Sequence, residues 1–339
     1  MKGKMEENFA QCFICSHFCK IREGQVGICG VHQNIGGKIR LINYGRCIAI
    51  HNDPIEKKPL FHFLPGTSVL SIGTMGCNLR CKNCQNWQIA QINGLKCQVQ
   101  KYKQMQWGYH LSPEKIIEEA LKCKAKSIAY TYNEPTVFLE YAYDTMLLAQ
   151  KNDLKNVWVS NGFMSEETLD KIIPFLNAIN IDLKSFSEDF YRSNCGASLK
   201  PILNNLRRLA KENVWLEITT LAIPSLSDDP EMFREIARFI QNELRDNVPW
   251  HISAFHPSYK LNYLPSTSLE TIEKAYEIGK EEGLKHVYGG NIPGKGLENT
   301  YCSKCKETLI ERIGYRTSPF YQKGECPKCK QALDGIFSP

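Results

Sequence analysis

Short apolar segments alternate with longer amphipathic segments through most of the chain. The apolar segments predict buried strands at 68–73, 127–131, 157–160, 178–183, 214–221, 250–255 and 286–288. Apolar residues at helical spacing predict a helix that begins at Pro113 and further helices at 137–150, 165–176, 201–212, 229–242 and 268–283. This alternation predicts an α/β fold in which helices wrap a parallel sheet. About six strand-helix units are too few for a closed barrel of eight, so we expect a partial (β/α)6 barrel.

The two ends of the chain depart from this alternation. Near the N-terminus, residues 38–44 alternate polar and apolar positions, which predicts a half-buried strand whose predicted partner is 46–50. Near the C-terminus the composition shifts and two Cys-x2-Cys pairs occur. We therefore expect three domains: a cysteine-rich N-terminal β extension at 1–64, the partial barrel at 65–295 and a ribbon-like domain at 296–339.

The composition of the 339 residues is ordinary for a soluble globular protein, with 42% hydrophobic and 23% charged residues. The net charge of +6 is spread along the chain, which favours a solvated surface over a nucleic-acid-binding one. The polar segment 1–10 does not resemble a signal peptide, and no stretch approaches the ~18 apolar residues of a membrane span. These features predict a cytoplasmic protein with neither a membrane nor a nucleic acid as partner.

Cysteine is the most informative residue type, with 15 in the chain. In a reducing compartment, closely spaced cysteines bind metal more often than they form disulfides. Eleven of the 15 fall into three clusters. We expect the isolated four to be small buried hydrophobic residues, namely Cys47, Cys97, Cys123 and Cys195.

The central cluster is Cys77-x3-Cys81-x2-Cys84, which directly follows the first predicted barrel strand. Iron-sulfur clusters usually take four thiolates, and this run supplies three, so one iron is left for another ligand. A coordination position of this kind is typical of catalytic metal sites. The alternative is a zinc site completed by a distant residue such as Cys97, which is less favoured because zinc knuckles usually come as paired Cys-x2-Cys motifs.

This three-cysteine run resembles the signature of the radical S-adenosylmethionine (SAM) superfamily. The resemblance implies a [4Fe-4S] cluster whose open iron binds the amino and carboxylate groups of SAM. It also implies that the reduced cluster cleaves the sulfonium bond to give a 5'-deoxyadenosyl radical, with an electron donor such as flavodoxin or ferredoxin. The residue before the third cysteine is usually aromatic in this superfamily and packs on the adenine, whereas it is Asn83 here.

The resemblance narrows when the preceding segments are included. The segment 53–66, together with Cys15-x3-Cys19, the Gly-Ile-Cys-Gly segment at 27–30 and the following segment 76–81, resembles the radical SAM enzymes of the AmmeMemoRadiSam system. That group is similar to the pyruvate formate-lyase activating enzymes. The resemblance implies an oxidoreductase whose unknown substrate is either a protein, as for glycyl-radical activators, or a target handled with two partner proteins.

Polar residues follow the predicted barrel strands, where ligands gather in folds of this kind. After the second strand, Glu134 and Pro135 match the Gly-Gly-Glu-Pro-type segment that receives the SAM amino group in related enzymes. After the third strand, Ser160 and Asn161 lie in a segment similar to the Thr-Asn-Gly segment near the SAM ribose and carboxylate. The alternative for 133–135 is a plain turn and helix start.

The fourth and sixth predicted strands end in further candidates. Asp182 and Lys184 match the Asp-Leu-Lys motif of the activating enzymes, which implies a place in the SAM pocket, and a structural ion pair is the alternative. His251 and His256 bracket the end of the sixth strand. We assign these histidines to substrate or SAM contacts, although a lone histidine is more often a satisfied core residue.

The two flanking cysteine clusters predict further metal sites. The N-terminal set consists of Cys12, Cys15, Cys19 and Cys29 and is a candidate site for zinc or an auxiliary iron-sulfur cluster. His17 is a possible substitute ligand, and a metal-free reduced loop is the alternative. The C-terminal set predicts a structural zinc ribbon, with rubredoxin-like iron as the competing occupant, and consists of Cys302, Cys305, Cys326 and Cys329. The rival to an enzyme is a non-catalytic metal-binding or nucleic-acid-binding scaffold in which all three clusters are structural.

Overall fold

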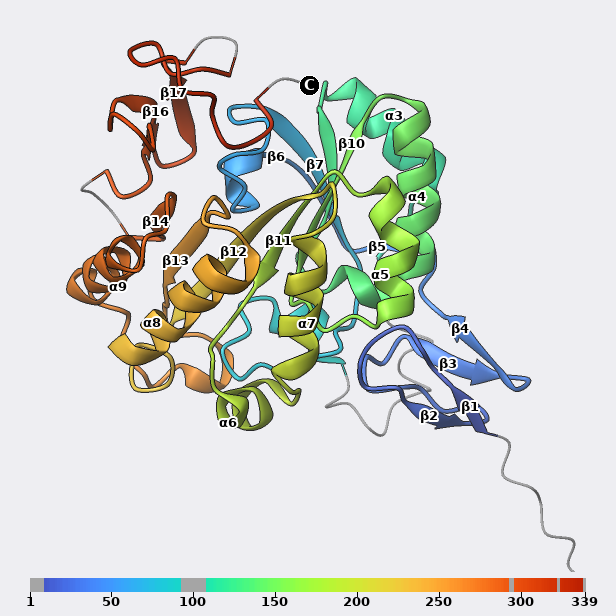
Figure 1. Ribbon diagram of the computed structural model, residues 1–339. Helices are drawn as coiled ribbons and strands as arrows, with labels where there is room; N and C mark the ends of the chain where they lie inside the picture. The colour runs from blue at the N-terminus through green and yellow to red at the C-terminus, as the bar shows by residue number, and fades with distance from the viewer. Residues whose placement is uncertain (1–8, 93–107, 293–295, 322–323, 338–339) are drawn as a thin grey trace, which may run out of the picture.

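The computed structural model describes residues 9–92, 108–292, 296–321 and 324–337. Its largest element is a sheet of eight strands whose order in space follows their order along the chain (Figure 1). Seven strands are parallel, namely β7 (Ser68–Gly73), β9 (Ser127–Tyr130), β10 (Lys155–Ser160), β11 (Ala178–Asp182), β12 (Trp215–Ala222), β13 (Trp250–Ala254) and β14 (Val287–Gly290). The sheet ends at β14 on one side and at β6 on the other, so the described residues form the partial barrel that the sequence predicted.

Helices alternate with these strands because apolar faces and capping residues recur between them. The helices are α3 (Pro113–Lys122), α4 (Leu139–Lys151), α5 (Glu166–Ile172), α7 (Lys200–Leu209), α8 (Pro230–Phe239) and α9 (Leu269–Glu281), with a short α6 (Glu188–Phe190) after β11. Ser112 caps α3 by accepting a hydrogen bond from the Lys115 N–H at 3.4 Å. Asp229 caps α8 by accepting one from the Glu231 N–H at 2.8 Å. Side-chain caps of this kind satisfy backbone donors that a helix start leaves unpaired.

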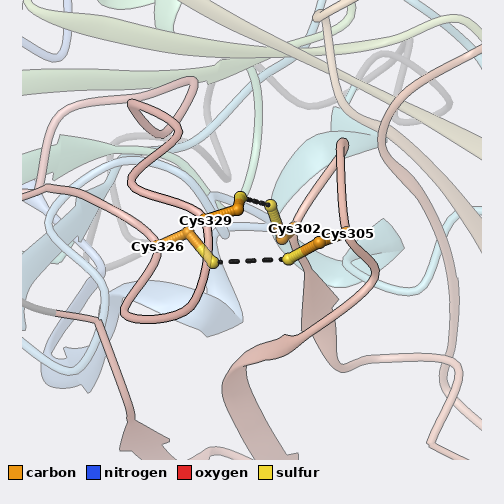
Figure 2. A group of neighbouring side chains, drawn as sticks. All are labelled: Cys302, Cys305, Cys326 and Cys329. Carbon is orange, nitrogen blue, oxygen red and sulfur yellow. Dashed lines mark hydrogen bonds between the residues drawn. The ribbon is translucent and has the colours of Figure 1, made fainter.

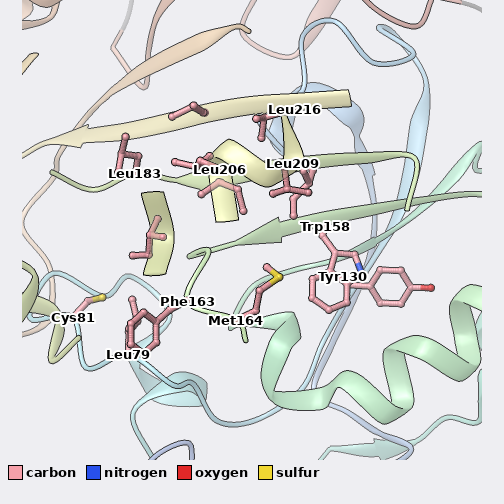
Figure 3. Packing of buried hydrophobic residues seen from close by; sticks show 14 of the residues in the cluster. Leu79, Cys81, Tyr130, Trp158, Phe163, Met164, Leu183, Leu206, Leu209 and Leu216 are labelled. Atoms are coloured by element: carbon pink, nitrogen blue, oxygen red, sulfur yellow. The ribbon is translucent and has the colours of Figure 1, made fainter. Parts of the chain in front are cut away.

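The main core lies between the sheet and these helices, and Figure 3 shows part of it. Trp158 of β10 and Leu206 of α7 are both fully buried there. Leu79 and Cys81, which belong to the loop after β7, are buried in the same cluster. The loop that carries the three central cysteines is therefore packed onto the core, which fixes its position.

The N-terminal extension is made of two small hairpins. β1 (Phe9–Gln11) pairs with β2 (Lys20–Arg22), and β3 (His32–Ile35) pairs with β4 (Lys38–Leu41). The predicted pairing of 38–44 with 46–50 is wrong, because Gly36 and Gly37 both have positive φ, 61° and 76°, and form a tight turn that pairs β4 with the preceding segment.

The residues from 46 onward join other parts of the fold. β5 (Arg46–Cys47) pairs with β8 (Tyr109–His110), and β6 (Ala49–Pro54) runs antiparallel along β7. The main sheet thus begins before the boundary predicted at residue 64. A short 3-10 helix, Ile55–Lys57, then leads toward β7.

The C-terminal segment forms a sheet of β15 (Thr300–Tyr301), β16 (Thr308–Ile313) and β17 (Arg316–Pro319). It docks beside the amino ends of the barrel strands, where the Leu64 N–H donates to the Ile336 carbonyl at 2.6 Å. Arg312 is 4% exposed and donates to the Phe61 carbonyl at 2.9 Å. Figure 1 shows β16 and β17 at the opposite end of the barrel from the loop after β7. None of the helices in the described segments is long and apolar enough to cross a membrane.

Candidate active site

The loop after β7 carries Cys77, Cys81 and Cys84 across the carboxyl edge of the sheet. Gly76 enters this loop with a φ of 95°, which favours glycine. A Cβ atom at this position would lie 2.7 Å from the Cys29 carbonyl oxygen, so a side chain would collide with the N-terminal extension. The glycine before the first cysteine is therefore required by both the turn and the close approach.

The environment of the central cysteines suits metal ligands. Burial, followed by the charge of Glu134, raises the pKa of the Cys77 thiol well above its usual range. Burial likewise raises the pKa of Cys84 to about 11. The Leu79 N–H donates to Cys77 Sγ at 3.4 Å, and the Asn86 N–H donates to Cys84 Sγ. Buried thiols of this kind ionise when a metal takes the place of the proton.

The donor set agrees with an iron-sulfur cluster. Within the described residues, the sulfur atoms of Cys77, Cys81 and Cys84 do not all lie within 4.8 Å of one another. A single zinc ion holds its thiolates about 3.8 Å apart, since Zn–S bonds are about 2.3 Å long and tetrahedral. A cluster in which each cysteine binds a different iron does not require that spacing, so the three thiols can serve as ligands of a [4Fe-4S] cluster.

A segment after β11 holds the central loop. The Arg80 N–H donates to the Cys195 carbonyl at 2.7 Å, and the Lys82 N–H donates to the Asn194 carbonyl at 3.0 Å. Asn194 Nδ2 donates to Asn83 Oδ1 at 2.9 Å. Asn83, where the superfamily usually has an aromatic residue, is 8% exposed and anchors the loop to this segment.

Cys195 was missed as a site residue by the sequence analysis. Its thiol is fully buried and shares a hydrogen bond with the thiol of Cys81. This bond lowers the pKa of Cys81 and raises that of Cys195, and burial adds to the rise at Cys195. Cys195 has no neighbouring cysteine in the sequence, and no spacing pattern signalled its position beside Cys81.

Glu134 connects the ends of β9 and β10. It is 1% exposed, and its Oε1 accepts hydrogen bonds from Ser160 Oγ at 2.8 Å and Thr136 Oγ1 at 2.6 Å. Its Oε2 accepts one from the Asn161 N–H at 2.8 Å. Burial raises the pKa of Glu134, while the donors from Asn161, Thr136 and Ser160 act against this rise. Pro135, which is buried, begins the 3-10 helix Pro135–Phe138 directly after it.

Asn161 joins this carboxylate to the central loop. Its Nδ2 donates to Asn78 Oδ1 at 2.8 Å and lies 3.9 Å from Cys77 Sγ. Asn133, whose role the sequence left open, donates from Nδ2 to the Gly76 carbonyl at 2.7 Å. The structure thus brings Glu134, Ser160 and Asn161 together beside the first central cysteine.

Asp182 and Lys184 lie at the end of β11, as the sequence predicted. Lys184 Nζ is 2.7 Å from Asp182 Oδ2, and its side chain is 17% exposed. Burial alone would lower the pKa of Lys184, but Asp182 and the sulfurs of Cys81 and Cys195 raise it well above its usual range. A charged ammonium therefore lies near the central cysteines.

The two candidate histidines lie at different ends of the barrel. His251, near the start of β13, is 5% exposed, and its Nε2 is 2.6 Å from the fully buried Glu217 Oε2. Its ring packs edge-on against Phe61 at 4.7 Å, next to the C-terminal domain. This placement makes His251 a partner in a buried hydrogen bond and separates it from the residues gathered around Cys77.

His256 lies past the end of β13, at the carboxyl edge. It is exposed, with Nε2 3.2 Å from the Asn291 carbonyl oxygen and Nδ1 3.3 Å from Ser266 Oγ. The same connection reaches the central loop, since the Lys260 N–H donates to the Lys82 carbonyl at 3.0 Å. His256 therefore lies on the side of the barrel where the sequence placed it.

The C-terminal cysteines form a compact four-sulfur group (Figure 2). All four sulfurs lie within 4.8 Å of one another, and both Cys302 to Cys329 and Cys305 to Cys326 are 3.6 Å apart. The two knuckles are alike: the Lys306 and Lys330 N–H groups donate to the carbonyl oxygens of Cys302 and Cys326, respectively, each at 3.0 Å. Both lysines have a positive φ, 62° and 59°. This geometry can bind one metal ion.

Fold and site together define a partial-barrel enzyme with its metal ligands at the carboxyl edge. The radical SAM superfamily matches residues 71–240. An uncharacterized protein of Methanocaldococcus jannaschii is 41% identical over 327 residues, which cover 96% of this chain and 95% of that protein. The chain belongs to the radical SAM superfamily.

More distant relatives agree with this family. The pyruvate formate-lyase 1-activating enzyme of Escherichia coli K12 is 20% identical over 231 residues, which cover 63% of this chain and 89% of that enzyme. The crystal structure of a radical SAM methyltransferase from Sphaerobacter thermophilus, at 13% identity, shares the fold with a TM-score of 0.52 over 73% of this chain and 71% of that chain. The prediction of a radical SAM enzyme that resembles the activating enzymes is confirmed. Family membership implies SAM, a [4Fe-4S] cluster and a reductant.

Proposed function

We propose that this enzyme binds SAM beside Cys77, Cys81 and Cys84 and uses it to abstract a hydrogen atom from a substrate at the carboxyl edge of the barrel. The observation that carries this proposal is the continuous set of hydrogen bonds from Glu134 through Asn161 and Asn78 to the neighbourhood of Cys77. It ties two strand ends and the cysteine loop into one rigid wall. Rigid support of this kind is what a cofactor site needs.

The residues of the chain take distinct roles in this proposal. When bound, the cluster supplies the electron that cleaves SAM to methionine and a 5'-deoxyadenosyl radical. Glu134 and Asn161 position the loop and present polar groups to the amino and carboxylate ends of SAM. The Lys184 ammonium, paired with Asp182 at 2.7 Å, offsets the negative charge of the thiolates. The packed core around Leu79 excludes water from the back of the loop.

The substrate class is proposed from the relatives. Two of them are named as activating enzymes, for pyruvate formate-lyase and for isethionate sulfite-lyase. We therefore propose a protein substrate, in line with glycyl-radical activators, and a flavodoxin- or ferredoxin-like electron donor. The resemblance to the AmmeMemoRadiSam system adds two partner proteins as the alternative handlers of the substrate. In either case the substrate approaches past the loops that follow β11 and β13, and His256 is a candidate contact.

For the C-terminal domain we propose a structural zinc ion. The 3.6 Å sulfur separations agree with the about 3.8 Å expected for tetrahedral zinc thiolates. The described residues of this domain form a small apolar cluster around Leu309 and Ile310, so a metal would supply much of its folding free energy.

The experiment is an assay for 5'-deoxyadenosine under anaerobic conditions, with iron-loaded protein, a chemical reductant and SAM. Wild type should release 5'-deoxyadenosine and methionine. Cys81→Ala should release neither and should lose the absorbance that the cluster at Cys77, Cys81 and Cys84 contributes, while it keeps one zinc per chain, about the content of a single ribbon site. Cys123→Ala is the matched control, because this partly exposed cysteine lies outside the three clusters. Absence of 5'-deoxyadenosine from reduced, iron-loaded wild type would leave the scaffold alternative.

A further inference from the structure

The N-terminal extension contains a second group of cysteines close to the central loop. Cys12, Cys15 and Cys29 are 6%, 8% and 7% exposed, and Cys19 is partly buried. The strands around them are only three or four residues long. Hairpins this short are not stable alone in water; this unit packs against the barrel through Cys29 and Val31 of the main core, and a bound metal would add to that stability.

Backbone donors surround these four sulfurs. The Ile14 N–H donates to Cys12 Sγ, the His17 N–H to Cys15 Sγ and the Ile28 N–H to Cys19 Sγ. The Val31 N–H donates to Cys29 Sγ. Three of these four donors lie two residues after their cysteine. Such hydrogen bonds stabilise a thiolate over a thiol.

The same two-residue pattern occurs at both of the other cysteine sites. Leu79 donates to Cys77 at the central loop, and Lys328 donates to Cys326 in the C-terminal domain. A loop that folds its backbone donors onto sulfur is thus common to every cysteine cluster in the described chain. The N-terminal cysteines share the local geometry of metal ligands, which argues against the metal-free loop.

The spacing of the sulfurs separates zinc from a cluster. Within the described residues, no three of the four N-terminal sulfurs lie within 4.8 Å of one another, whereas all four C-terminal sulfurs do. Zinc thiolates are about 3.8 Å apart. Neither the N-terminal sulfurs nor those of Cys77, Cys81 and Cys84 meet the spacing that a single zinc ion needs, and a multi-iron cluster does not require that spacing.

Histidine does not complete the N-terminal set. His32 Nδ1 is 3.5 Å from Cys29 Sγ and His32 Nε2 is 3.3 Å from Glu140 Oε2, and among the described residues no group of three ligand atoms within 4.8 Å of one another includes His32. His17, the predicted substitute ligand, turns away, with Nε2 2.8 Å from the Asn78 carbonyl oxygen. The ligand set is thus four thiols, which is the usual complement of a closed [4Fe-4S] cluster.

We propose that Cys12, Cys15, Cys19 and Cys29 bind a second [4Fe-4S] cluster, distinct from the one at the central loop. With four thiolates, every iron has a protein ligand, so this cluster does not bind SAM. It lies next to the SAM site, because the Cys29 carbonyl is against Gly76 and His17 contacts the Asn78 carbonyl. The proposal concerns metal content and holds whatever substrate the enzyme has.

The test is the metal and sulfide content of the full chain after anaerobic iron and sulfide loading. Wild type should hold about eight irons, about eight acid-labile sulfides and about one zinc. A Cys77→Ala, Cys81→Ala, Cys84→Ala triple variant should keep about four irons and about four sulfides, because the N-terminal set is intact. Cys123→Ala should match wild type.

The triple variant makes the test decisive even if changes in the N-terminal set prevent folding. Iron with equal sulfide in that variant, and an EPR signal on reduction that SAM leaves unaltered, support the proposal. Loss of all sulfide from the triple variant would overturn it. A wild type with about two zincs, one of which is lost in Cys12→Ala, Cys15→Ala, would overturn it as well and would assign the site to zinc. Iron without sulfide would reflect mononuclear iron in the ribbon and would also contradict the proposal.

Discussion

Glu134→Gln is the substitution that tests most sharply how the barrel supports the site. The carboxylate accepts from two backbone donors, the Thr136 N–H at 3.1 Å on Oε1 and the Asn161 N–H at 2.8 Å on Oε2. Glutamine replaces one oxygen with an NH2 group. Whichever way the amide points, its nitrogen faces one of these two N–H groups, so one buried donor loses its acceptor.

The size of the effect follows from these contacts. A buried donor left without a partner costs about 1–3 kcal/mol, and hydrogen bonds to the remaining oxygen weaken when its charge is removed. Removal of a buried charge offsets part of this loss, since burial raises the pKa of Glu134. We expect the free energy of unfolding to fall by about 2 kcal/mol. We expect the rate of 5'-deoxyadenosine release to fall about tenfold or more, because about 1.4 kcal/mol at the barrier is a factor of ten.

Two measurements check this prediction: urea unfolding of the metal-loaded protein followed by circular dichroism, and 5'-deoxyadenosine release at saturating SAM. The control is Glu118→Gln on α3, whose side chain is 59% exposed and pairs with Lys115 at the surface. It should change the free energy of unfolding by less than about 0.5 kcal/mol. If Glu134→Gln behaved like the control in both measurements, the proposed positioning role of Glu134 would be wrong.

Three further predictions concern the regions around the site. Arg312→Met removes donors to the carbonyls of Phe61 and Glu298, and should lower the free energy of unfolding in urea by about 3 kcal/mol; a change below about 0.5 kcal/mol would contradict the docking role. Burial alone would raise the pKa of Asp53, but the hydrogen bonds from Lys58 and Lys57 hold this pKa well below 3.8. The contacts of Asp53 with the two lysines therefore stabilise the protein above pH 3.8, and this stabilisation is lost as pH falls through the folded pKa. The difference in urea midpoint between wild type and Asp53→Asn should thus be constant from about pH 7 to 5 and shrink below about pH 4, and a difference that grows in acid would contradict it. A chelator that removes the ribbon zinc should lower the thermal midpoint with iron absorbance unchanged, and an unchanged midpoint would show that the metal is not structural.

The strands and helices of the barrel could be predicted because their signals are local. The predicted strand 68–73 coincides with β7, and 214–221 differs from β12 by one residue at each end. The helix caps Ser112 and Asp229 are also local signals, because each side-chain oxygen accepts from a backbone N–H only two or three residues further along the chain. Glu134 after β9 and Asn161 after β10 lie close together because parallel strands end at the same edge of the sheet.

Contacts between distant segments could not be predicted. Asn83 meets Asn194, and Cys81 meets Cys195, across a stretch of chain that carries no periodic signal. We predicted a substrate or SAM contact for His251 from its place on the sixth strand. The structure instead pairs it with Glu217, which lies on the neighbouring strand near the amino edge of the sheet. Hairpin register near the N-terminus depended on two glycines with positive φ, which set the pairing of β3 with β4.

The central claim is that Cys77, Cys81 and Cys84 leave an iron that SAM binds. The most direct test is low-temperature EPR of the reduced protein with and without SAM. SAM should alter the spectrum of wild type and should leave that of the Cys77→Ala, Cys81→Ala, Cys84→Ala variant unaltered. Identical wild-type spectra with and without SAM, recorded from iron-loaded protein, would contradict the claim.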